Sequence, residues 1–371
     1  MADTQNTAAK TPVTVLTGYL GAGKTTLLNR ILSENHGQKY AVIVNEFGEI
    51  GIDNDLIVGA DEEVFEMNNG CVCCTVRGDL IRILSGLMKR KGRFDAIIVE
   101  TTGLADPGPV AQTFFVDEEI KARTYLDSVT TLVDARHFEQ ALKDGKEAKE
   151  QIAFADHIIL NKTDLVSEDK LDEIEGRLRG LNPLATIRRA HRSDVPIKQL
   201  LNQHRFDLAK MESVDNHGHD HDHEHDHHDH DHGHDHHHHD HDHDHAHHGP
   251  AHGEAGHVHD EHCSHTINPI HDEEIKSVSL TSEKPIDGVR FTQWLDKLLA
   301  EKGQDILRAK GILNVKGEDK RLVFQAVHMI LEGELQQPWK AGDPRISRAV
   351  FIGRHLDGAA LKAGFEATIA A

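Results

Sequence analysis

The amino-acid sequence predicts an α/β protein built on a doubly wound, mostly parallel sheet. In the first half of the 371-residue chain, short apolar segments alternate with segments of helical pattern, and this alternation is typical of such a sheet. Several apolar segments also end beside a polar residue, which is where open α/β sheets bind ligands. The strands expected are Val13–Leu16, Tyr40–Asn45, Ala96–Glu100, Val129–Asp134 and His157–Leu160, with helices at Thr25–Ser33 and around Asp79–Lys91.

One segment departs from globular composition. Residues Asp215–His265 hold 24 of the 32 histidines and 14 acidic residues, without Lys or Arg, and so carry −14 of the formal net charge of −21. Because almost no apolar side chain there can be buried, we expect a disordered, histidine-rich linker over residues 211–272. It would separate a first domain, residues 1–210, from a smaller α+β domain, residues 273–371. The elements expected in the smaller domain are strands Lys276–Leu280, Arg321–Val327 and Ala349–Ile352 and a helix Phe291–Glu301.

Charge and hydrophobicity exclude several classes of protein. An acidic balance without a basic patch argues against a nucleic-acid partner. No apolar run reaches the roughly eighteen residues of a membrane span, and the polar N-terminal residues lack the pattern of a signal peptide. Three of the four cysteines lie too close together for a disulfide framework, which favours reduced thiols. We therefore expect a cytoplasmic protein without a membrane partner.

A glycine-rich segment, Gly18–Thr25, follows the first predicted strand and opens the first predicted helix. It matches the P-loop pattern GxxxxGK followed by Ser or Thr, in which backbone N–H groups and a helix N-terminus bind phosphates. Lys24 would contact the β- and γ-phosphates and Thr25 would ligate Mg²⁺. The first domain is therefore expected to be a P-loop NTPase, and the alternative is an incidental glycine-rich turn. The phosphate-binding residues expected are Gly18, Gly21, Ala22, Gly23, Lys24, Thr25 and Thr26.

The segment Asn161–Asp164, with the sequence Asn-Lys-Thr-Asp, follows the predicted strand His157–Leu160. A carboxylate at its fourth position can accept two N–H bonds from guanine and would repel the lone pairs of adenine. Asn161, Lys162 and Asp164 are therefore predicted to bind a guanine nucleotide, GTP or GDP. The alternative is that Asp164 only caps a helix.

The segment Glu100–Gly103 lies where nucleotide-hydrolysing proteins of this type sense the γ-phosphate. Glu100 would hold the hydration shell of Mg²⁺ or orient the attacking water, and the sequence leaves both roles open. Gly103 would donate its N–H to the γ-phosphate. With Lys24 these residues are expected to support GTP hydrolysis, and the alternative is a turn with an N-capping Thr.

Three thiols crowd into the segment Cys71-Val72-Cys73-Cys74. Thiolates favour Zn²⁺ or Cu(I), and three protein ligands with an exchangeable position suit delivery of the ion better than a closed structural site. The acidic, glycine-rich segment Asn45–Asp53 would supply a fourth ligand, Glu49, with Glu46 as the second choice. The alternative is a turn that contains small buried cysteines.

The histidine-rich segment has the chemistry of a multisite metal buffer. Imidazole binds Zn²⁺, Ni²⁺, Co²⁺ and Cu²⁺ with little selectivity, and an ordinary pKa of about 6.5 leaves most of these side chains neutral at pH 7. Cys263 adds a soft ligand to the segment. A solvated spacer without a metal role is the alternative. Four histidines elsewhere are expected to be structural: His137, His157, His328 and His355.

With these motifs the chain resembles the CobW family of GTP-dependent metallochaperones, relatives of the urease and hydrogenase nickel-insertion GTPases. The resemblance covers nearly the whole chain. It includes Gly18–Thr25, Asn45–Asp53, Gly70–Cys74, Glu100–Gly103 and Asn161–Asp164, and in the smaller domain Arg308–Gly311, Phe324–His328 and Phe351–His355. It implies that Cys71, Cys73, Cys74 and Glu49 bind zinc or cobalt and that the nucleotide state tunes this site.

Two features of the family have no clear counterpart. The zinc chaperone of eukaryotes carries a Pro-Leu-Val-type motif before the P-loop that docks its client, and Thr11–Val15 does not reproduce it, so that client is not expected here. The only candidate for the final nucleotide-contacting loop is the region Ala190–Ser193.

The sequence therefore predicts a GTPase that binds Zn²⁺, or Co²⁺, and transfers it to a client apo-metalloprotein, with Mg²⁺ bound beside GTP. A metal-storage protein built around the histidine-rich segment, with auxiliary GTPase activity, is one alternative. A kinase or ATPase that uses the same P-loop is another. The client and the oligomeric state, for which a homodimer is one option, stay open.

Overall fold

A computed structural model describes residues 10–34, 37–45, 63–67, 73–89, 94–201, 275–339 and 342–370. The predicted histidine-rich linker, residues 211–272, lies outside the described residues, and so do Glu46, Glu49, Cys71 and Cys263. Within the described part of the chain, none of the helices combines the length and the hydrophobicity that a bilayer crossing requires.

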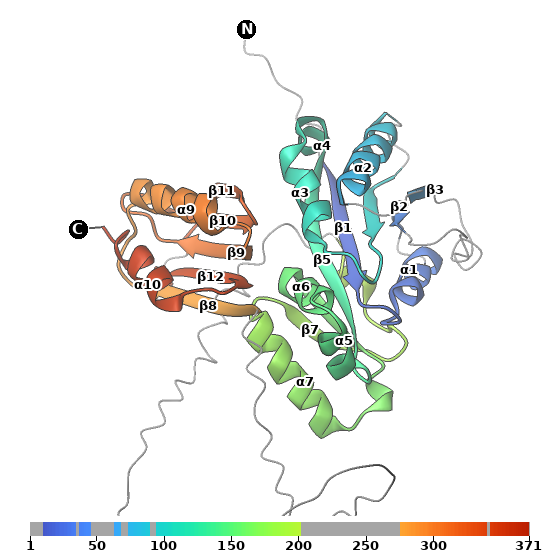
Figure 1. Ribbon diagram of the computed structural model, residues 1–371. Helices are drawn as coiled ribbons and strands as arrows, with labels where there is room; N and C mark the ends of the chain where they lie inside the picture. The colour runs from blue at the N-terminus through green and yellow to red at the C-terminus, as the bar shows by residue number, and fades with distance from the viewer. Residues whose placement is uncertain are drawn as a thin grey trace, which may run out of the picture. The chain divides into compact units, whose positions relative to one another are not determined.

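The first part of the chain forms a seven-stranded sheet with the order β3-β2-β4-β1-β5-β6-β7 (Figure 1). Each neighbouring pair of strands in this sheet is parallel, which confirms the predicted α/β fold class. The strands are β1 (Thr11–Gly18), β2 (Tyr40–Asn45), β3 (Glu63–Met67), β4 (Ala96–Glu100), β5 (Thr124–Asp134), β6 (His157–Asn161) and β7 (Thr186–Arg189). The sequence analysis missed β3 and β7, at the two edges of the sheet.

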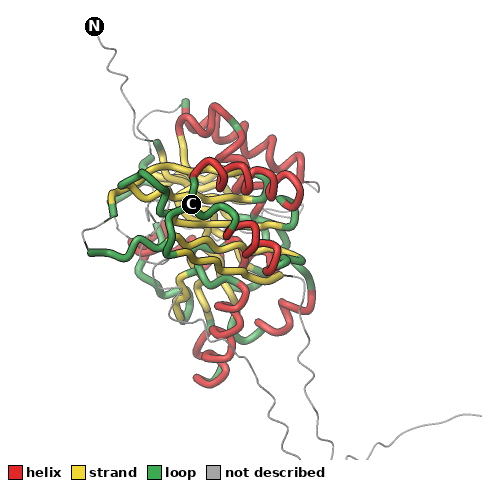
Figure 2. The backbone as a smooth tube through the Cα atoms, turned by 90° about the vertical axis from the view of Figure 1, so that its left-hand side faces the viewer, coloured by secondary structure: helices red, strands yellow, loops and turns green. Residues whose placement is uncertain are grey.

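Helices cover both faces of this sheet, and Figure 2 colours the helices of the chain red and its strands yellow. The α-helices are α1 (Lys24–Ser33), α2 (Cys73–Met88), α3 (Gly108–Val116), α4 (Glu118–Arg123), α5 (Phe138–Asp144), α6 (Glu147–Phe154) and α7 (Glu168–Leu181). The described residues of this domain also form two short 3₁₀ helices, η2 (Thr163–Leu165) and η3 (Ile197–Gln199). The helix expected around Asp79–Lys91 is α2, which begins six residues earlier, at Cys73.

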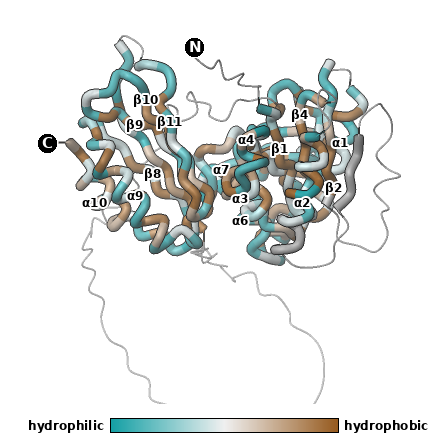
Figure 3. The backbone as a smooth tube through the Cα atoms, turned by 90° about the horizontal axis from the view of Figure 1, so that it is seen from above, coloured by the Kyte–Doolittle hydropathy of each residue, from teal (hydrophilic) through white to brown (hydrophobic). Residues whose placement is uncertain are grey.

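Side chains of the central strands alternate between two hydrophobic clusters, as the period of a β-strand requires. On β4, Ile97 and Val99 join the cluster that includes residues of α2, α3 and α4, whereas Ile98 joins the cluster around α1. Both faces are therefore buried, and β4, brown in Figure 3, is apolar up to its last residue, Glu100. This explains why the sequence analysis recognised the central strands as continuous apolar runs.

The last part of the chain forms a five-stranded antiparallel sheet with the order β11-β10-β9-β12-β8. Its elements are β8 (Ile275–Ser282), α9 (Gly288–Lys302), β9 (Ile306–Leu313), β10 (Lys320–Val327), β11 (Ile330–Pro338), β12 (Ser347–Arg354) and α10 (Gly358–Glu366). The predicted α+β character is confirmed, although β9 and β11 were not expected.

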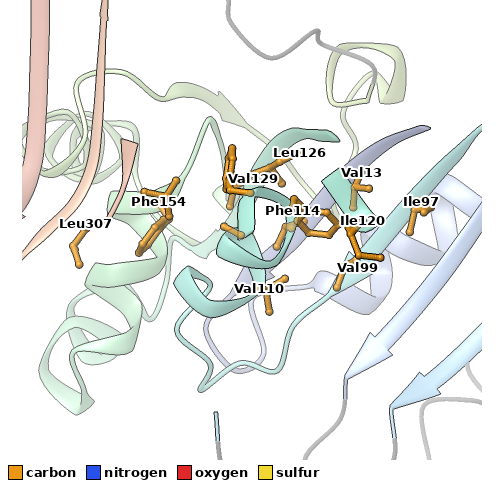
Figure 4. Close-up of a cluster of buried hydrophobic side chains, with 14 of the residues drawn as sticks. Val13, Ile97, Val99, Val110, Phe114, Ile120, Leu126, Val129, Phe154 and Leu307 are labelled. Atoms are coloured by element: carbon orange, nitrogen blue, oxygen red, sulfur yellow. The ribbon is translucent and has the colours of Figure 1, made fainter. Parts of the chain in front are cut away.

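The two faces of the second sheet have different partners. On one face, α9 and α10 enclose an aromatic cluster, in which the Phe291 ring lies 5.1 Å from that of Phe324 and 5.6 Å from that of Trp294. On the other face, Leu307 and Ile352 belong to the same cluster of buried hydrophobic side chains as Phe154 of α6 (Figure 4). The second sheet is therefore anchored to the first domain by apolar contact at α6.

Candidate functional site

The P-loop connects the end of β1 to the start of α1, as the sequence predicted. Gly18 has a φ of 140°, and a Cβ at this position would lie 2.4 Å from the carbonyl oxygen of Leu132 on β5. Gly23 has a φ of 108°, and a Cβ there would lie 2.5 Å from Nδ2 of Asn161. Only glycine combines the left-handed backbone with this close approach, so both glycines are required to form the loop against its neighbours.

Lys24 is the first residue of α1 and points back across the loop. Its Nζ donates to the carbonyl oxygens of Gly18, at 2.9 Å, and Tyr19, at 3.4 Å. The ammonium group is thereby held over the loop whose backbone N–H groups begin the helix, and the helix N-terminus adds a partial positive charge. This arrangement provides a concentrated positive site for phosphates, with Thr25 and Thr26 following in the first turn of α1.

Glu100 ends β4, which pairs with β1 on one side and β2 on the other. Its side chain is buried, and the next residue, Thr101, donates its N–H to the carbonyl oxygen of Leu16 at 2.9 Å. The hydroxyl of Thr101 also donates to Oγ1 of Thr17 at 2.8 Å. These bonds bind the segment that follows β4 to the end of β1, beside the P-loop.

Gly103 lies directly against the P-loop. A Cβ at Gly103 would come within 2.8 Å of the backbone nitrogen and 2.9 Å of the Cα of Leu20. Glycine is therefore needed because the two backbones approach each other, a contact that the sequence analysis did not foresee. The structure thus brings Lys24, which follows β1, together with the buried Glu100 and with Gly103, at and after the end of β4, to the carboxyl-terminal edge of the sheet.

Asn161 joins three segments of the site. It is 2% exposed, and its Nδ2 donates to the carbonyl oxygen of Ala22 at 2.9 Å and to Oγ of Ser193 at 3.2 Å. Its Oδ1 accepts from the backbone N–H of Ser193 at 2.9 Å. The hydroxyl of Ser193 in turn donates to the carbonyl oxygen of Gly23 at 3.3 Å. Asn161 therefore holds the P-loop and the Ala190–Ser193 region together. The sequence analysis named this region only as a candidate nucleotide-contacting loop, and it did not predict the bonds of Ser193 to Asn161 and Gly23 because no local pattern marks them.

Lys162 bonds to an acidic residue that the sequence analysis noted only as a strand end. Its Nζ lies 2.7 Å from Oδ2 of Asp134, and Nδ1 of His137 lies 3.0 Å from the same oxygen. Burial pushes the pKa of Asp134 upward, but the hydrogen bonds from Lys162 and His137 outweigh it and hold the pKa below its usual value. Asp134 therefore stays ionised and fixes the Lys162 side chain beside the P-loop.

Asp164 lies in η2 with its side chain 43% exposed, and its Oδ2 is 3.5 Å from Nε2 of His191. The hydroxyl of Thr163 donates to the carbonyl oxygen of Ala190 at 3.0 Å. The Asn161–Asp164 segment and the Ala190–Ser193 region therefore lie side by side. An accessible carboxylate in this position can accept the two N–H groups of a guanine base.

The candidate metal ligands are described only in part. Cys73 and Cys74 begin α2, but their side chains, like Cys71, Glu49 and Glu46, lie outside the described residues. Among the residues that are described, no group of three or more His, Cys, Asp or Glu side chains could hold a metal ion. His157 is buried and the His328 ring packs against Phe154, as expected of structural histidines.

The parallel sheet determines where α2 begins. Strand β3 runs parallel to β1 with β2 and β4 between them. The carboxyl ends of parallel strands meet at one edge of a sheet, and Cys73 follows β3 as the P-loop follows β1. The first turn of α2 therefore lies at the edge of the sheet that carries the P-loop.

The parallel sheet and the glycine loop that leads from β1 into α1 define a P-loop NTPase. Residues 12–189 match the CobW/HypB/UreG nucleotide-binding domain, and residues 275–369 match the cobalamin synthesis protein cobW C-terminal domain. The chain belongs to the CobW/HypB/UreG family and is a GTPase.

Similar proteins span almost the whole chain. The zinc chaperone YjiA of Escherichia coli is 34% identical over 95% of this chain and 97% of its own, and the zinc chaperone CobW of Pseudomonas aeruginosa is 33% identical over 96% and 90%. The crystal structure of Zn(II)-bound YjiA superimposes with a TM-score of 0.66 at 27% identity, covering 98% of this chain and 100% of that chain. A zinc-regulated GTPase metalloprotein activator of Dictyostelium discoideum is 40% identical over 54% of this chain and 50% of its own.

Proposed function

We propose that this GTPase is a metallochaperone that binds Zn²⁺ and transfers it to a client apo-metalloprotein. The ligands are the thiolates of Cys71, Cys73 and Cys74 and the carboxylate of Glu49. Zinc is favoured over cobalt because the similar proteins carry the names of zinc chaperones and because thiolates suit Zn²⁺. The ion is cargo, so one exchangeable position is left for a ligand of the client.

The observation that carries this proposal is the shared edge of the parallel sheet. The P-loop follows β1, the Glu100–Gly103 segment follows β4, and Cys73 follows β3, with β2 in between. Three strand spacings of about 4.8 Å separate β1 from β3, so the phosphate site and the first turn of α2 are about 15 Å apart along this edge. A segment of a few residues can span this distance.

That segment is Asn45–Asp53, which follows β2 and contains Glu49. In the proposed cycle, GTP with Mg²⁺ orders this segment and brings Glu49 to the thiolates, which completes the metal site. Hydrolysis removes the γ-phosphate, releases the segment and lowers the affinity for Zn²⁺, so that the ion can pass to the client. Coupling of this kind is typically worth about 1–3 kcal/mol, or roughly 5- to 150-fold in affinity.

Hydrolysis itself requires the residues around the P-loop. Lys24 neutralises charge on the β- and γ-phosphates, and Thr25 holds Mg²⁺ through its hydroxyl. The N–H of Gly103 contacts the γ-phosphate, and Glu100 orients the attacking water or holds the hydration shell of Mg²⁺. Guanine is read by the carboxylate of Asp164, while Asn161 and Lys162 hold the base-binding segment against the P-loop.

The test is a Zn²⁺ titration of a variant that lacks residues 211–272, with a non-hydrolysable GTP analogue and with GDP. This deletion removes the imidazoles that would mask a thiolate site, and it leaves the compact unit formed by the rest of the chain. We expect one tight site whose affinity is roughly 5- to 150-fold higher with the GTP analogue. Equal affinities in the two nucleotide states would reject the switch.

A cysteine variant locates the site. Cys73→Ser in the same background should remove the tight site. The deletion itself removes Cys263, so a tight site that persists in the deletion variant does not use that thiol. If deletion of residues 211–272 abolishes all tight Zn²⁺ binding, the result would instead favour the alternative function, metal storage by the histidine-rich segment.

A further inference from the structure

Helix α6 buries polar side chains to an unusual degree. Lys149, Glu150 and Gln151 are consecutive, and each is at most 8% exposed. Buried polar groups cost free energy unless they are bonded, so a helix of this kind persists only where its partners are well placed. Two sets of partners are present on α6, and they belong to different parts of the molecule.

The first set belongs to the segment that contacts the P-loop. Gln151 is 1% exposed, and its Nε2 donates to the carbonyl oxygens of Gly103 and Ala105, each at 3.1 Å. Both N–H groups of the amide are thereby used on one short segment. The carbonyl oxygen of the Gln151 backbone accepts from the hydroxyl of Thr131 on β5 at 2.8 Å, which fixes the helix to the sheet.

The second set belongs to the antiparallel sheet. Arg354, the last residue of β12, bonds to Glu150, whose side chain is 2% exposed. Burial raises the pKa of Glu150, and Asp106 adds to this effect, while Arg354 and Lys146 oppose it. Arg354 therefore helps to keep a carboxylate ionised that would otherwise be driven toward its neutral form.

The end of α6 is held by the same sheet. Arg308 on β9 donates to the carbonyl oxygen of Phe154 and lies 2.6 Å from Asp156, which also bonds to Lys310. The ring of Phe154 lies 5.5 Å from that of His328, which follows β10. Through adjacent residues, α6 thus touches both the γ-phosphate-sensing segment and the second sheet.

We propose that Gln151 is a positioning residue for GTP hydrolysis, and that α6 transmits the position of the second sheet to the Gly103–Ala105 segment through the Glu150–Arg354 pair. The proposal rests on the contact between Gly103 and the γ-phosphate proposed above. Its consequence is that the C-terminal domain, and any client bound to it, controls the rate of hydrolysis.

Transmission is physically reasonable because the Glu150–Arg354 contact and the Gln151–Gly103 contact are made by adjacent residues of α6. Glu150 and Gln151 are adjacent on one turn of helix, so a shift of Arg354 that tilts this turn also moves the amide that holds Gly103. A misplacement of about 1 Å in a group that orients a reacting phosphate can cost on the order of 100-fold in rate. Small displacements at the second sheet are therefore sufficient to change hydrolysis.

The decisive variant is Gln151→Met, which keeps the length of the side chain and removes both N–H donors. We expect kcat for GTP to fall by roughly 10- to 100-fold, with KM and the affinity for GDP unchanged within about twofold. Gln151→Leu, which also removes the two donors and adds no buried charge, should show the same pattern and serves if Gln151→Met does not fold. Equal loss of GTP and GDP affinity at an unchanged kcat would overturn the proposal.

Asn182 provides a matched control. It is also a buried amide that bonds to α6, since its Nδ2 donates to the carbonyl oxygens of Ile152, Ala153 and Ala155 at 2.8, 3.2 and 2.9 Å. Its Oδ1 accepts from the backbone N–H groups of Leu184 and Ala185, so none of these amide bonds involves the Gly103–Ala105 segment. Asn182→Ala should therefore lower thermal stability but leave kcat near the wild-type value well below its Tm. A kcat as low as that of Gln151→Met would mean that α6 serves only as a scaffold.

The transmitting step has its own test. Arg354→Met should lower kcat by roughly 3- to 30-fold without weakening GDP binding. Adding Glu150→Gln should recover part of this loss, because it removes a buried carboxylate that keeps only the more distant Lys146, at 3.9 Å, as a partner. Wild-type kcat in Arg354→Met would reject the transmission. Different measurements test the proposed function itself. It fails if the Zn²⁺ affinity does not depend on the bound nucleotide, or if Gly103→Ala hydrolyses GTP at the wild-type rate.

Discussion

The two sheets of this protein use β-structure differently. In the parallel sheet, β1, β4 and β6 end at Gly18, Glu100 and Asn161, and these ends meet at one edge. In the antiparallel sheet, successive strands run in opposite directions, so their ends are divided between two edges. The first arrangement gathers polar loops into a ligand site at one edge of the sheet. The second arrangement does not gather its loops in this way, and its contacts are made by the two faces of the sheet.

The charged residues of the second sheet follow from this difference. Arg308 and Lys310 on β9 and Arg354 on β12 point to a face, and their partners Asp156 and Glu150 belong to or follow α6. They are buried or partly buried and fully paired, as buried charges must be. In the first domain the residues of the nucleotide site gather at the carboxyl-terminal edge of the sheet. In the second domain the ion pairs attach the sheet to α6 and, in our proposal, transmit its position to the nucleotide site.

The largest expected effect is the loss of the P-loop lysine. Lys24→Ala removes the ammonium that lies over the phosphate-binding loop and should lower kcat/KM for GTP by on the order of a thousandfold, with no loss of the helical circular-dichroism signal. Lys297→Ala, which removes an exposed lysine of α9 in the second domain, should leave hydrolysis unchanged. Comparable GTPase activity in the two variants would mean that GTP is not hydrolysed at the carboxyl-terminal edge of the parallel sheet.

The next effect concerns the attachment of the second sheet. Asp156→Asn leaves Arg308 and Lys310 buried without their carboxylate and should lower the free energy of unfolding by about 3–5 kcal/mol, measured by chemical denaturation. Asp319→Asn removes an exposed partner of Arg345 and should cost less than about 1 kcal/mol. Similar losses in the two variants would contradict the view that the Asp156 pairs anchor the domain.

A smaller effect tests base recognition at the first sheet. Asp164→Ala should reduce the preference for GTP over ATP by roughly 10- to 100-fold, because the charged acceptor for the guanine N–H groups is lost. Competitive binding of the two nucleotides measures the preference. Asp169→Ala, which removes an exposed carboxylate from the first turn of α7, is the control. An unchanged preference in Asp164→Ala would support a nucleotide-dependent kinase or ATPase instead.

The smallest expected effect is the pH dependence of stability. Burial would raise the pKa of Asp156, but Arg308 and Lys310 outweigh it and hold the pKa far below its usual value. A carboxyl with a lowered pKa in the folded state stabilises fully above its unfolded pKa of about 3.9 and loses this contribution as the pH falls toward its folded pKa. Between pH 5 and the acid limit, the free energy of unfolding of the wild type should therefore fall by about 2 kcal/mol more than that of Asp156→Asn. Parallel pH profiles would show that Asp156 is not the titrating group.

The central strands and the nucleotide motifs could be predicted from the sequence because each is a local pattern. A strand buried on both faces, such as Ala96–Glu100, is apolar throughout, and the P-loop carries its glycines at fixed spacing. The edge strands β3 and β7 were missed because neither stands out as a continuous apolar run: β3 is Glu-Val-Phe-Glu-Met and β7 is Thr-Ile-Arg-Arg. Local composition therefore revealed the centre of the sheet and not its edges.

By itself, the sequence determined the class of fold, the phosphate-binding loop and the guanine motif, since their chemistry resides in neighbouring residues. Only the tertiary structure decided that Asn161 bonds to Ser193, that Gly103 lies against Leu20, and that Gln151 holds the segment beside it. These contacts join residues that are 32 to 83 positions apart in the chain. No local pattern specifies such pairs, because their partners meet only when parallel strands and their crossover helices pack around a common core.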